Sequence, residues 1–211
     1  MTKIVVFGAG GRAGSRVVAE AARRGHQVTA VVRDPAKYAD LERSGVTVVA
    51  GDVTDEASVA AVSAGHDAAV SAVFAADADP AQFYTSAAEA LVSGLIEGGV
   101  GRVVTVGVGT ALEAAPGVAV HDTPEFPAEY RGFSVGHSTE IAILGASDLD
   151  WAVVTPPPAV LTEGEGTGSY RTGGTSLLPP VEGDFSYADL ALALVDEATD
   201  GKHHRTVVAV G

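Results

Sequence analysis

The sequence predicts an α/β fold built on a doubly wound, mostly parallel sheet, and three observations lead to this prediction. Short apolar runs alternate regularly with helix-like segments over the first 110 residues. These runs are apolar on both faces, as is typical of parallel strands covered by helices on each side. The first run leads directly into the glycine-rich segment "GAGGRAG" (8–14), which precedes a helical pattern. Alternation of this kind implies right-handed crossovers and a Rossmann fold.

The expected elements follow one another without a convincing interdomain linker. Strands are predicted at 3–7, 27–32, 46–51, 67–73, 102–108, 148–154 and 205–210. Helices are predicted at 15–25, 34–45, 54–65, 80–97, 133–147 and 185–201.

Local signals mark several helix ends. Gly25 closes the first helix, and Asp34 before a proline reads as an N-cap of the second. Either Thr54 or Asp55 caps the third. Ser186 and Asp189 form a capping box at the last helix, with Phe185 stapled against Leu190.

Two segments carry no regular pattern. Residues 112–130 are rich in Pro, Gly, Ala and acidic residues, which predicts a long loop and a candidate lid. Residues 162–174 are dense in glycine and predict a loop or hairpin, in which Tyr170 and Arg171 are candidates for the rim of a substrate site.

Composition excludes several classes of protein. Thirteen basic and 27 acidic residues give a formal net charge of −14, which disfavours binding to nucleic acid or anionic membranes. The absence of cysteine excludes disulfides, thiolate metal sites and thiol catalysis. No apolar run approaches the roughly 20 residues that cross a bilayer, and the N-terminus runs straight into the first strand without room for a signal peptide. We therefore expect a cytoplasmic protein.

The glycine loop predicts a dinucleotide site. Gly8, Gly11 and Gly14 are spaced G-x-x-G-x-x-G, and Gly8, Gly10 and Ala13 fit the looser dinucleotide fingerprint as well. Glycines at these positions allow a sharp turn, close approach of a pyrophosphate to the backbone, and tight packing of the helix on the sheet. The helix then presents free N–H groups to the phosphates.

The end of the second strand indicates which dinucleotide is bound. Arg33 lies where an arginine accommodates a 2′-phosphate, and Arg12 lies inside the glycine loop. Two guanidinium groups in an acidic chain favour NADP(H) over NAD(H). Asp34 is a competing signal that we interpret as a helix cap.

A second acidic position follows the third strand. Asp52 and Val53 lie where the adenine ring would bind, so Asp52 could accept from the adenine amino group while Val53 packs on the ring. Asp52 as a cap of the following helix is an equally weighted alternative.

The segments "KIVVFGAGGRAGSRVVAEAARRGHQVTAVVRDPAK" and "GDVTD" resemble the atypical short-chain dehydrogenase/reductases, and most of all the NAD(P)H-binding group of NmrA-like and biliverdin-IXβ/flavin reductase-like proteins. The resemblance continues at "DLDWAVVTPPPAV", where that group has a proline-rich turn beside the nicotinamide, and at "FSYADLALALVDE". It implies one Rossmann domain over 1–211, with a dinucleotide core at 1–110 and substrate-side elements at 111–211. The implied cofactor site comprises Gly8, Gly10, Gly11, Arg12, Ala13, Gly14, Arg33, Asp52, Val53, Ala72, Val73, Gly107, Thr155 and Pro156.

The chain departs from the pattern of the wider superfamily. The usual Tyr-x-x-x-Lys pair is absent, since Tyr130 is followed four residues later by Ser134. The usual serine or threonine beside the nicotinamide is displaced to Thr110 or replaced by Thr105. The resemblance places His137 in the acceptor pocket, where a histidine could donate a proton. A partly exposed histidine without a role is the alternative.

We expect an NADPH-dependent oxidoreductase that reduces a flat small-molecule acceptor, such as a flavin or quinone, by direct hydride transfer. A non-catalytic NADP(H)-sensing NmrA-like regulator is the main alternative, followed by a sugar-nucleotide epimerase or dehydratase. No metal, nucleic acid or membrane partner is expected, and a homodimer stays open. His121 is expected to be solvated, and Tyr84 to pack in the core. His203 and His204 are expected in a turn before the last strand, without nearby carboxylates of fixed geometry that would suit a metal.

Overall fold

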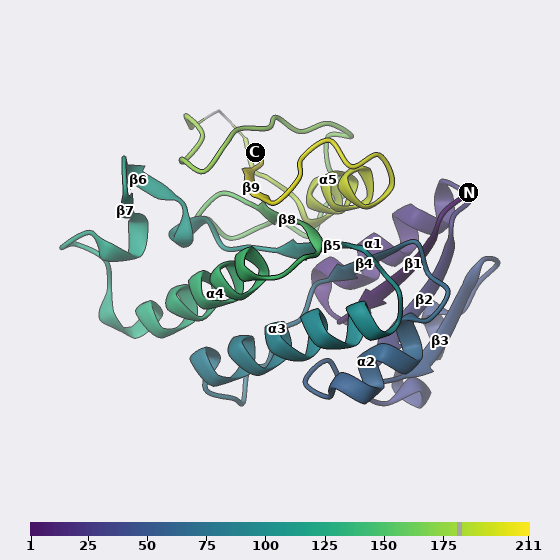
Figure 1. Ribbon diagram of the computed structural model, residues 1–211. Helices are drawn as coiled ribbons and strands as arrows, with labels where there is room; N and C mark the ends of the chain where they lie inside the picture. Colours follow the sequence, from purple (N-terminus) through teal and green to yellow (C-terminus); the bar gives the residue numbers. More distant parts are fainter. Residues whose placement is uncertain (181–182) are drawn as a thin grey trace.

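The computed structural model describes residues 1–180 and 183–211 and has three layers, with helices on both faces of one sheet (Figure 1). The strands are β1 (Lys3–Phe7), β2 (Gln27–Val32), β3 (Val46–Ala50), β4 (Ala68–Ser71), β5 (Arg102–Val106), β6 (Glu113–Ala115), β7 (Val118–Ala119), β8 (Asp150–Thr155) and β9 (Thr206–Ala209). The α-helices are α1 (Arg12–Arg23), α2 (Glu56–Ser63), α3 (Pro80–Glu97), α4 (Ala128–Ala146) and α5 (Tyr187–Thr199). Short 3-10 helices are η1 (Pro35–Leu41), η2 (Gly109–Ala111) and η3 (Val120–Asp122).

Seven strands form the main sheet in the order β3-β2-β1-β4-β5-β8-β9, and all their pairings are parallel. The predicted doubly wound parallel sheet is confirmed. The strand order reverses direction between β1 and β4, and in such sheets ligands bind outside the carboxyl ends of the strands at this switch point.

Alternate residues of each strand enter two separate cores. Ile4 and Val6 of β1 face α1 and α5, whereas Val5 and Phe7 face α2, α3 and α4. All four side chains are at most 1% exposed, because both faces of the central strand are covered. This double burial explains the uninterrupted apolar runs in the sequence.

The segment predicted as a long loop at 112–130 is more ordered than expected. It contains the antiparallel hairpin of β6 and β7, which projects at the left of Figure 1, then η3 and the first turn of α4. Strands this short carry too little alternation to stand out in a sequence rich in Ala, Gly and Pro. The helix predicted at 34–45 is shorter than expected, since only the 3-10 helix η1 forms there.

Helix caps separate the alternatives left open by the sequence. Asp55, not Thr54, caps α2 by accepting from the N–H of Ser58 at 3.1 Å. At α5 the Ser186 half of the predicted capping box is confirmed, since the Ser186 hydroxyl accepts from the N–H of Asp189 at 2.9 Å. The Asp189 carboxylate accepts from that same hydroxyl at 2.8 Å. Asp34 is the N-cap residue of η1 and is followed by Pro35, as predicted, but its side chain accepts no N–H from η1 and pairs instead with Lys37 at 3.5 Å.

Among the described residues, no helix is long and apolar enough to cross a membrane.

Candidate functional site

The glycine loop joins β1 to α1 at the switch point, and its shape depends on missing side chains. Gly8 has φ +73°, and a Cβ there would lie 2.5 Å from the Ala72 carbonyl oxygen at the end of β4. A Cβ on Gly14 would lie 2.1 Å from the Gly8 carbonyl oxygen. Neither position can accept a side chain without moving backbone, so glycine is required there for close packing of β1, β4 and α1.

The N-terminus of α1 has no side-chain cap. Its N-cap residue is Gly11, whose own N–H donates to the Gly8 carbonyl at 3.0 Å. The N–H groups of the first helical turn, which include those of Arg12 and Ala13, have no intrahelical acceptors. Exposed donors at the positive end of a helix bind anions. The loop therefore fits the diphosphate of a dinucleotide, as the sequence predicts.

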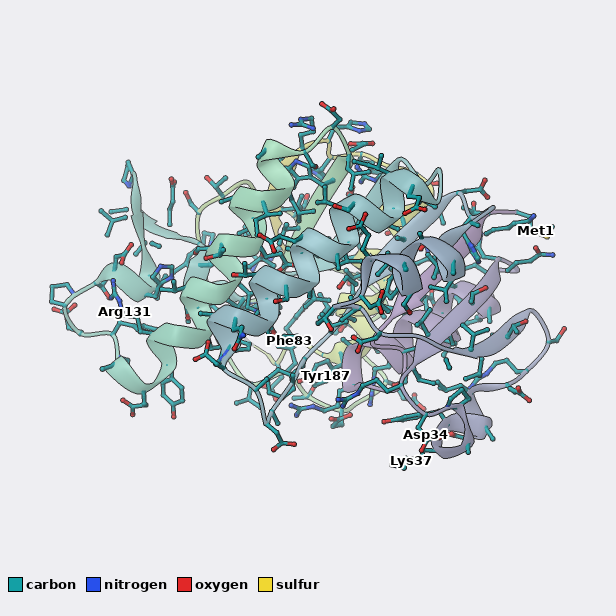
Figure 2. All side chains as sticks on the ribbon, turned by 60° about the horizontal axis from the view of Figure 1, so that its bottom comes forward. Met1, Asp34, Lys37, Phe83, Arg131 and Tyr187 are labelled. Carbon is teal, nitrogen blue, oxygen red and sulfur yellow. The ribbon has the colours of Figure 1, made fainter. Side chains whose placement is uncertain are left out.

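Charged side chains follow β2 and β3 at the carboxyl edge of the sheet, next to the glycine loop. Arg33 is exposed and, among the described residues, forms no ion pair. Asp34 and Lys37 lie together at the lower right of Figure 2.

Asp52 follows β3, where its Oδ1 accepts from the N–H and hydroxyl of Thr54 at 2.9 and 2.7 Å. These two bonds hold the pKa of Asp52 below its usual value, and the charge of Arg33 lowers it further. The alternative that Asp52 caps α2 is wrong, since Asp55 does so. Asp52 is exposed, and Val53 is half-buried against the core under α2 and α3.

Arg12 is directed toward α5. Its guanidinium lies 5.2 Å from the ring centroid of Tyr187, and that of Arg16 lies 5.7 Å from the same ring. Tyr187 lies near the middle of Figure 2, well apart from Asp34 and Lys37. In this geometry Arg12 borders the diphosphate end of the loop, so its expected contact with a 2′-phosphate stays a prediction.

The ends of β4, β5 and β8 supply the remaining predicted cofactor residues. Ala72 pairs with β1 through its N–H, which donates to the Phe7 carbonyl at 3.0 Å, and Val73 is half-buried beside it. A Cβ on Gly107 would lie 2.3 Å from Oγ1 of Thr155, so the hydroxyl of Thr155 is packed against β5.

The proline turn after β8 packs tightly on the segment after β5. A Cβ on Gly109 would lie 2.6 Å from the Pro156 carbonyl oxygen. Because Thr155 is 1% exposed and Pro156 is also buried, these two residues offer backbone rather than side chains to a ligand.

His137 is buried, not partly exposed. It is 4% exposed and lies in α4 against α3, with its ring centroid 4.0 Å from that of Tyr84 and 4.9 Å from that of Phe133. Its Nδ1 lies 3.1 Å from a carboxylate oxygen of Glu140, which is also buried. Glu140 therefore favours the proton on Nδ1 and the tautomer with an unprotonated Nε2.

Tyr84 links this cluster to the sheet edge. Its hydroxyl points at the Val73 carbonyl at 3.5 Å, and burial together with the Glu140 charge raises its pKa, which keeps the phenol neutral. Phe133 also meets Phe74, which follows Val73 and is 63% exposed. An exposed aromatic ring thus lies next to the predicted nicotinamide position.

The segment before α4 is pinned by His121, which is buried, contrary to expectation. Its Nδ1 lies 2.9 Å from the Thr110 carbonyl, and Arg131 donates to the His121 carbonyl and the Asp122 carboxylate. Arg131 is at the left of Figure 2. The segment is thus fastened to α4 and η2, and its role as a lid stays a prediction.

The paired histidines lie at the opposite, amino end of the sheet, and both have carboxylate partners. His203 meets Glu197 at 2.7 Å and His204 meets Asp150 at 2.9 Å. The described residues contain no cluster of three or more side chains suited to a metal ion.

Sequence reasoning missed several residues of the site. Glu140 had a readable signal, its spacing of three residues from His137 on a helix. Tyr187 and Tyr38 had none, because their contacts are made across the fold: a Cβ on Gly10 would lie 2.3 Å from the Tyr38 ring.

Comparison with known proteins agrees with this geometry. A family model described as NAD(P)H-binding matches residues 8–201. The protein YwnB of Bacillus subtilis is 32% identical over 95% of this chain and 94% of its own. A Burkholderia pseudomallei structure whose name describes it as exported is 40% identical over all of both chains, with a TM-score of 0.87.

A Streptococcus pneumoniae structure named as an NADH-flavin reductase is 28% identical, covers 100% of this chain and 99% of its own, and has a TM-score of 0.84. The expected cytoplasmic location stays a prediction.

Proposed function

The chain belongs to the NAD(P)H-binding family, and on this premise we propose that it is an NADPH-dependent oxidoreductase that reduces a flat organic acceptor such as a flavin or quinone. The observation that carries the proposal is the uncapped start of α1 behind a loop whose glycines leave no room for side chains. A diphosphate is the anion that both fits such a loop and places a nicotinamide over the ends of β4, β5 and β8.

The choice of NADPH rests on Arg33. Arg33 directly follows β2, at the place where the adenosine ribose binds in this fold. Within the described residues, its guanidinium is not engaged in an ion pair. A guanidinium binds phosphate through charge-assisted bidentate hydrogen bonds. Lys37, on the same side, adds positive charge, although Asp34 partly neutralises it.

Reduction needs a hydride, which the reduced nicotinamide supplies when bound, and a proton. The residues of this chain orient the two partners: Gly107 and the backbone of Thr155 and Pro156 line the nicotinamide position, and Phe74 offers a ring against which a flat acceptor can stack. His137 holds a proton at Nδ1 toward Glu140, with Tyr84 between this pair and the sheet edge. We propose that this buried pair tunes proton delivery to the acceptor.

A regulatory protein that binds NADP(H) without turnover is the second candidate. Burial of His137 and the lack of a Tyr-x-x-x-Lys pair favour it, since each removes an accessible proton donor expected of an enzyme. The missing pair also weakens the epimerase or dehydratase alternative.

Stopped-flow oxidation of NADPH in the presence of FMN, riboflavin or menadione tests the proposal. We expect saturable, enzyme-dependent oxidation with at least one acceptor, and a slower reaction with NADH. A control variant, Gly14→Ala, should lose the reaction together with nucleotide binding, because its methyl would collide with Gly8. Tight NADPH binding without oxidation by any acceptor would refute the proposed reductase and favour the regulatory protein.

A further inference from the structure

A second feature of the carboxyl edge is a cavity of about 500 Å³ beyond the proline turn. Its walls come from the ends of three neighbouring strands: Leu112 after β5, residues 157–161 after β8, and residues 209–211 after β9. Residues 167–171 and 177–180 close it from outside. The cavity therefore continues the line that runs along the edge from the glycine loop through Gly107 and Pro156.

The lining is mainly apolar. Leucine, proline, valine, phenylalanine and tyrosine side chains predominate, including those of Leu112, Pro157, Leu161, Leu177, Leu178 and Phe185. Its charged members are Arg171, Asp184 and Asp189. Arg171 donates to the Pro179 carbonyl at 3.1 Å.

The Asp189 carboxylate is fully engaged and faces no free ligand position. It accepts from the N–H groups of Thr167 and Gly168, each at 2.9 Å, and from the Ser186 hydroxyl at 2.8 Å. Burial disfavours its charge, but these bonds prevail and lower its pKa below the usual value. A carboxylate buried to 1% exposure thus anchors the covering segment to α5.

Backbone pairing holds the other side of the cover. Arg171 and Gly211 exchange hydrogen bonds of 2.8 and 3.2 Å, and the Gly173 N–H donates to the Ala209 carbonyl at 2.8 Å. These bonds fix residues 167–173 of the cover against α5 and the C-terminal residues. A cavity of several hundred Å³ with apolar walls is the usual form of a small-molecule site.

We propose that this cavity binds an apolar substituent of the acceptor, and that the substrate is an uncharged ring carrying an aliphatic tail, of the prenylated or alkylated quinone class. The inference rests on the proposed function. The ring lies beside the nicotinamide, and the tail passes over Pro157 into the cavity. A phosphate-bearing flavin suits this lining less, because the net charge of the chain is −14 and Asp184 lies on the lining.

The reaction balances without another reactant. A quinone takes one hydride, with two electrons, from NADPH, and one proton from the protein or solvent. The products are the hydroquinone and NADP⁺.

Calorimetric binding of naphthoquinones with and without an alkyl tail, in the absence of NADPH, tests the inference separately from turnover. In the wild type we expect each buried methylene to tighten binding up to about fourfold, so that a short tail lowers Kd by more than about tenfold. Leu178→Trp fills the cavity, because the Leu178 side chain reaches both Gly173 and Gly211. It should cut the benefit of the tail to within about twofold and leave NADPH binding unchanged.

Leu178→Ala enlarges the cavity and should retain the preference for a tail, which separates filling from misfolding. Ile96→Trp is the matched control, since Ile96 is 53% exposed on α3 outside the lining and should change nothing. Equal affinity for tailed and tailless quinones in the wild type would overturn the inference. An unchanged tail preference in Leu178→Trp would also overturn it. So would FMN that competes with the tailed quinone in the wild type and no longer binds to Leu178→Trp. Absence of turnover alongside tail-dependent binding would instead refute the proposed function and leave the cavity assignment standing.

Discussion

If Arg33 binds the 2′-phosphate as we propose, its replacement by alanine should abolish discrimination between NADPH and NADH. Arg33 is exposed at the end of β2 and, within the described chain, spends its charge on no ion pair. Binding of a 2′-phosphate therefore costs no broken contact in the free protein. Loss of the Arg33 side chain should therefore lower the affinity for NADPH alone.

The size of the effect follows from the local charges. A hydrogen bond to a charged group contributes about 1.5–3 kcal/mol, and exposure places Arg33 toward the lower end. Asp52 lies close enough for the charge of Arg33 to lower its pKa, so the variant also leaves the negative charge of Asp52 uncompensated near the end of β2. We expect Kd for NADPH to rise about 10- to 100-fold and Kd for NADH to change less than about twofold.

Calorimetric titration of wild type and variant with both nucleotides measures this difference. Arg23→Ala is the control: it removes an exposed guanidinium from the far end of α1, where Arg23 pairs with Glu20. Added salt should weaken NADPH binding to the wild type more than to Arg33→Ala, because exposed charges are screened.

Equal losses for the two nucleotides would refute the reasoning, since they would place Arg33 on a group common to both. A loss of affinity for NADH alone would indicate that Arg33 binds the ribose hydroxyl. Unchanged affinity for both would move the adenosine end of the site away from β2.

Three further changes test other parts of the molecule. Glu140→Gln should reduce kcat about tenfold or more and displace its pH profile, with little change in nucleotide affinity, since the charge beside His137 is removed; an unmoved profile would make Glu140 purely structural. Gly14→Ala should abolish nucleotide binding and lower stability by about 1–3 kcal/mol, because the new methyl meets Gly8, as titration and thermal melting would reveal; a variant that binds normally would contradict the packing argument. The pKa of Asp189 is lowered in the folded state, so its stabilisation is present above the unfolded pKa near 4 and lost as pH falls through the folded value. Asp189→Asn should therefore lower Tm at neutral pH by about 3–8 °C and flatten the acid side of the Tm–pH curve, and a parallel curve would exclude the carboxylate as its source.

Much of the fold could be predicted because the central parallel strands are buried on both faces and several helices begin at a recognisable cap, such as Asp55 or Ser186. The need for glycine at positions 8 and 14 could be predicted for the same kind of reason, since a Cβ at either position would meet backbone, whereas their binding of a cofactor stays a prediction. Such constraints are local and act within one strand–helix unit.

What the sequence could not predict depends on contacts across the fold. Neighbouring residues do not reveal that Arg12 meets Tyr187, or that His121 is buried by Thr110 and Arg131. The sequence does not predict the cavity, but it does suggest Tyr170 and Arg171 for the rim of a substrate site, and both residues line the cavity. Its walls come from three strand ends far apart in the chain.

The covering segment of the cavity is secured by one buried carboxylate on α5 and by a few backbone bonds, whereas the glycine loop is restricted by backbone collisions on several sides. Descendants of this chain could consequently exchange or lengthen the cover and acquire new acceptors while their use of nucleotide stayed the same. Laboratory selection for altered acceptor range would be best directed at residues 167–180, with the first fourteen residues left alone.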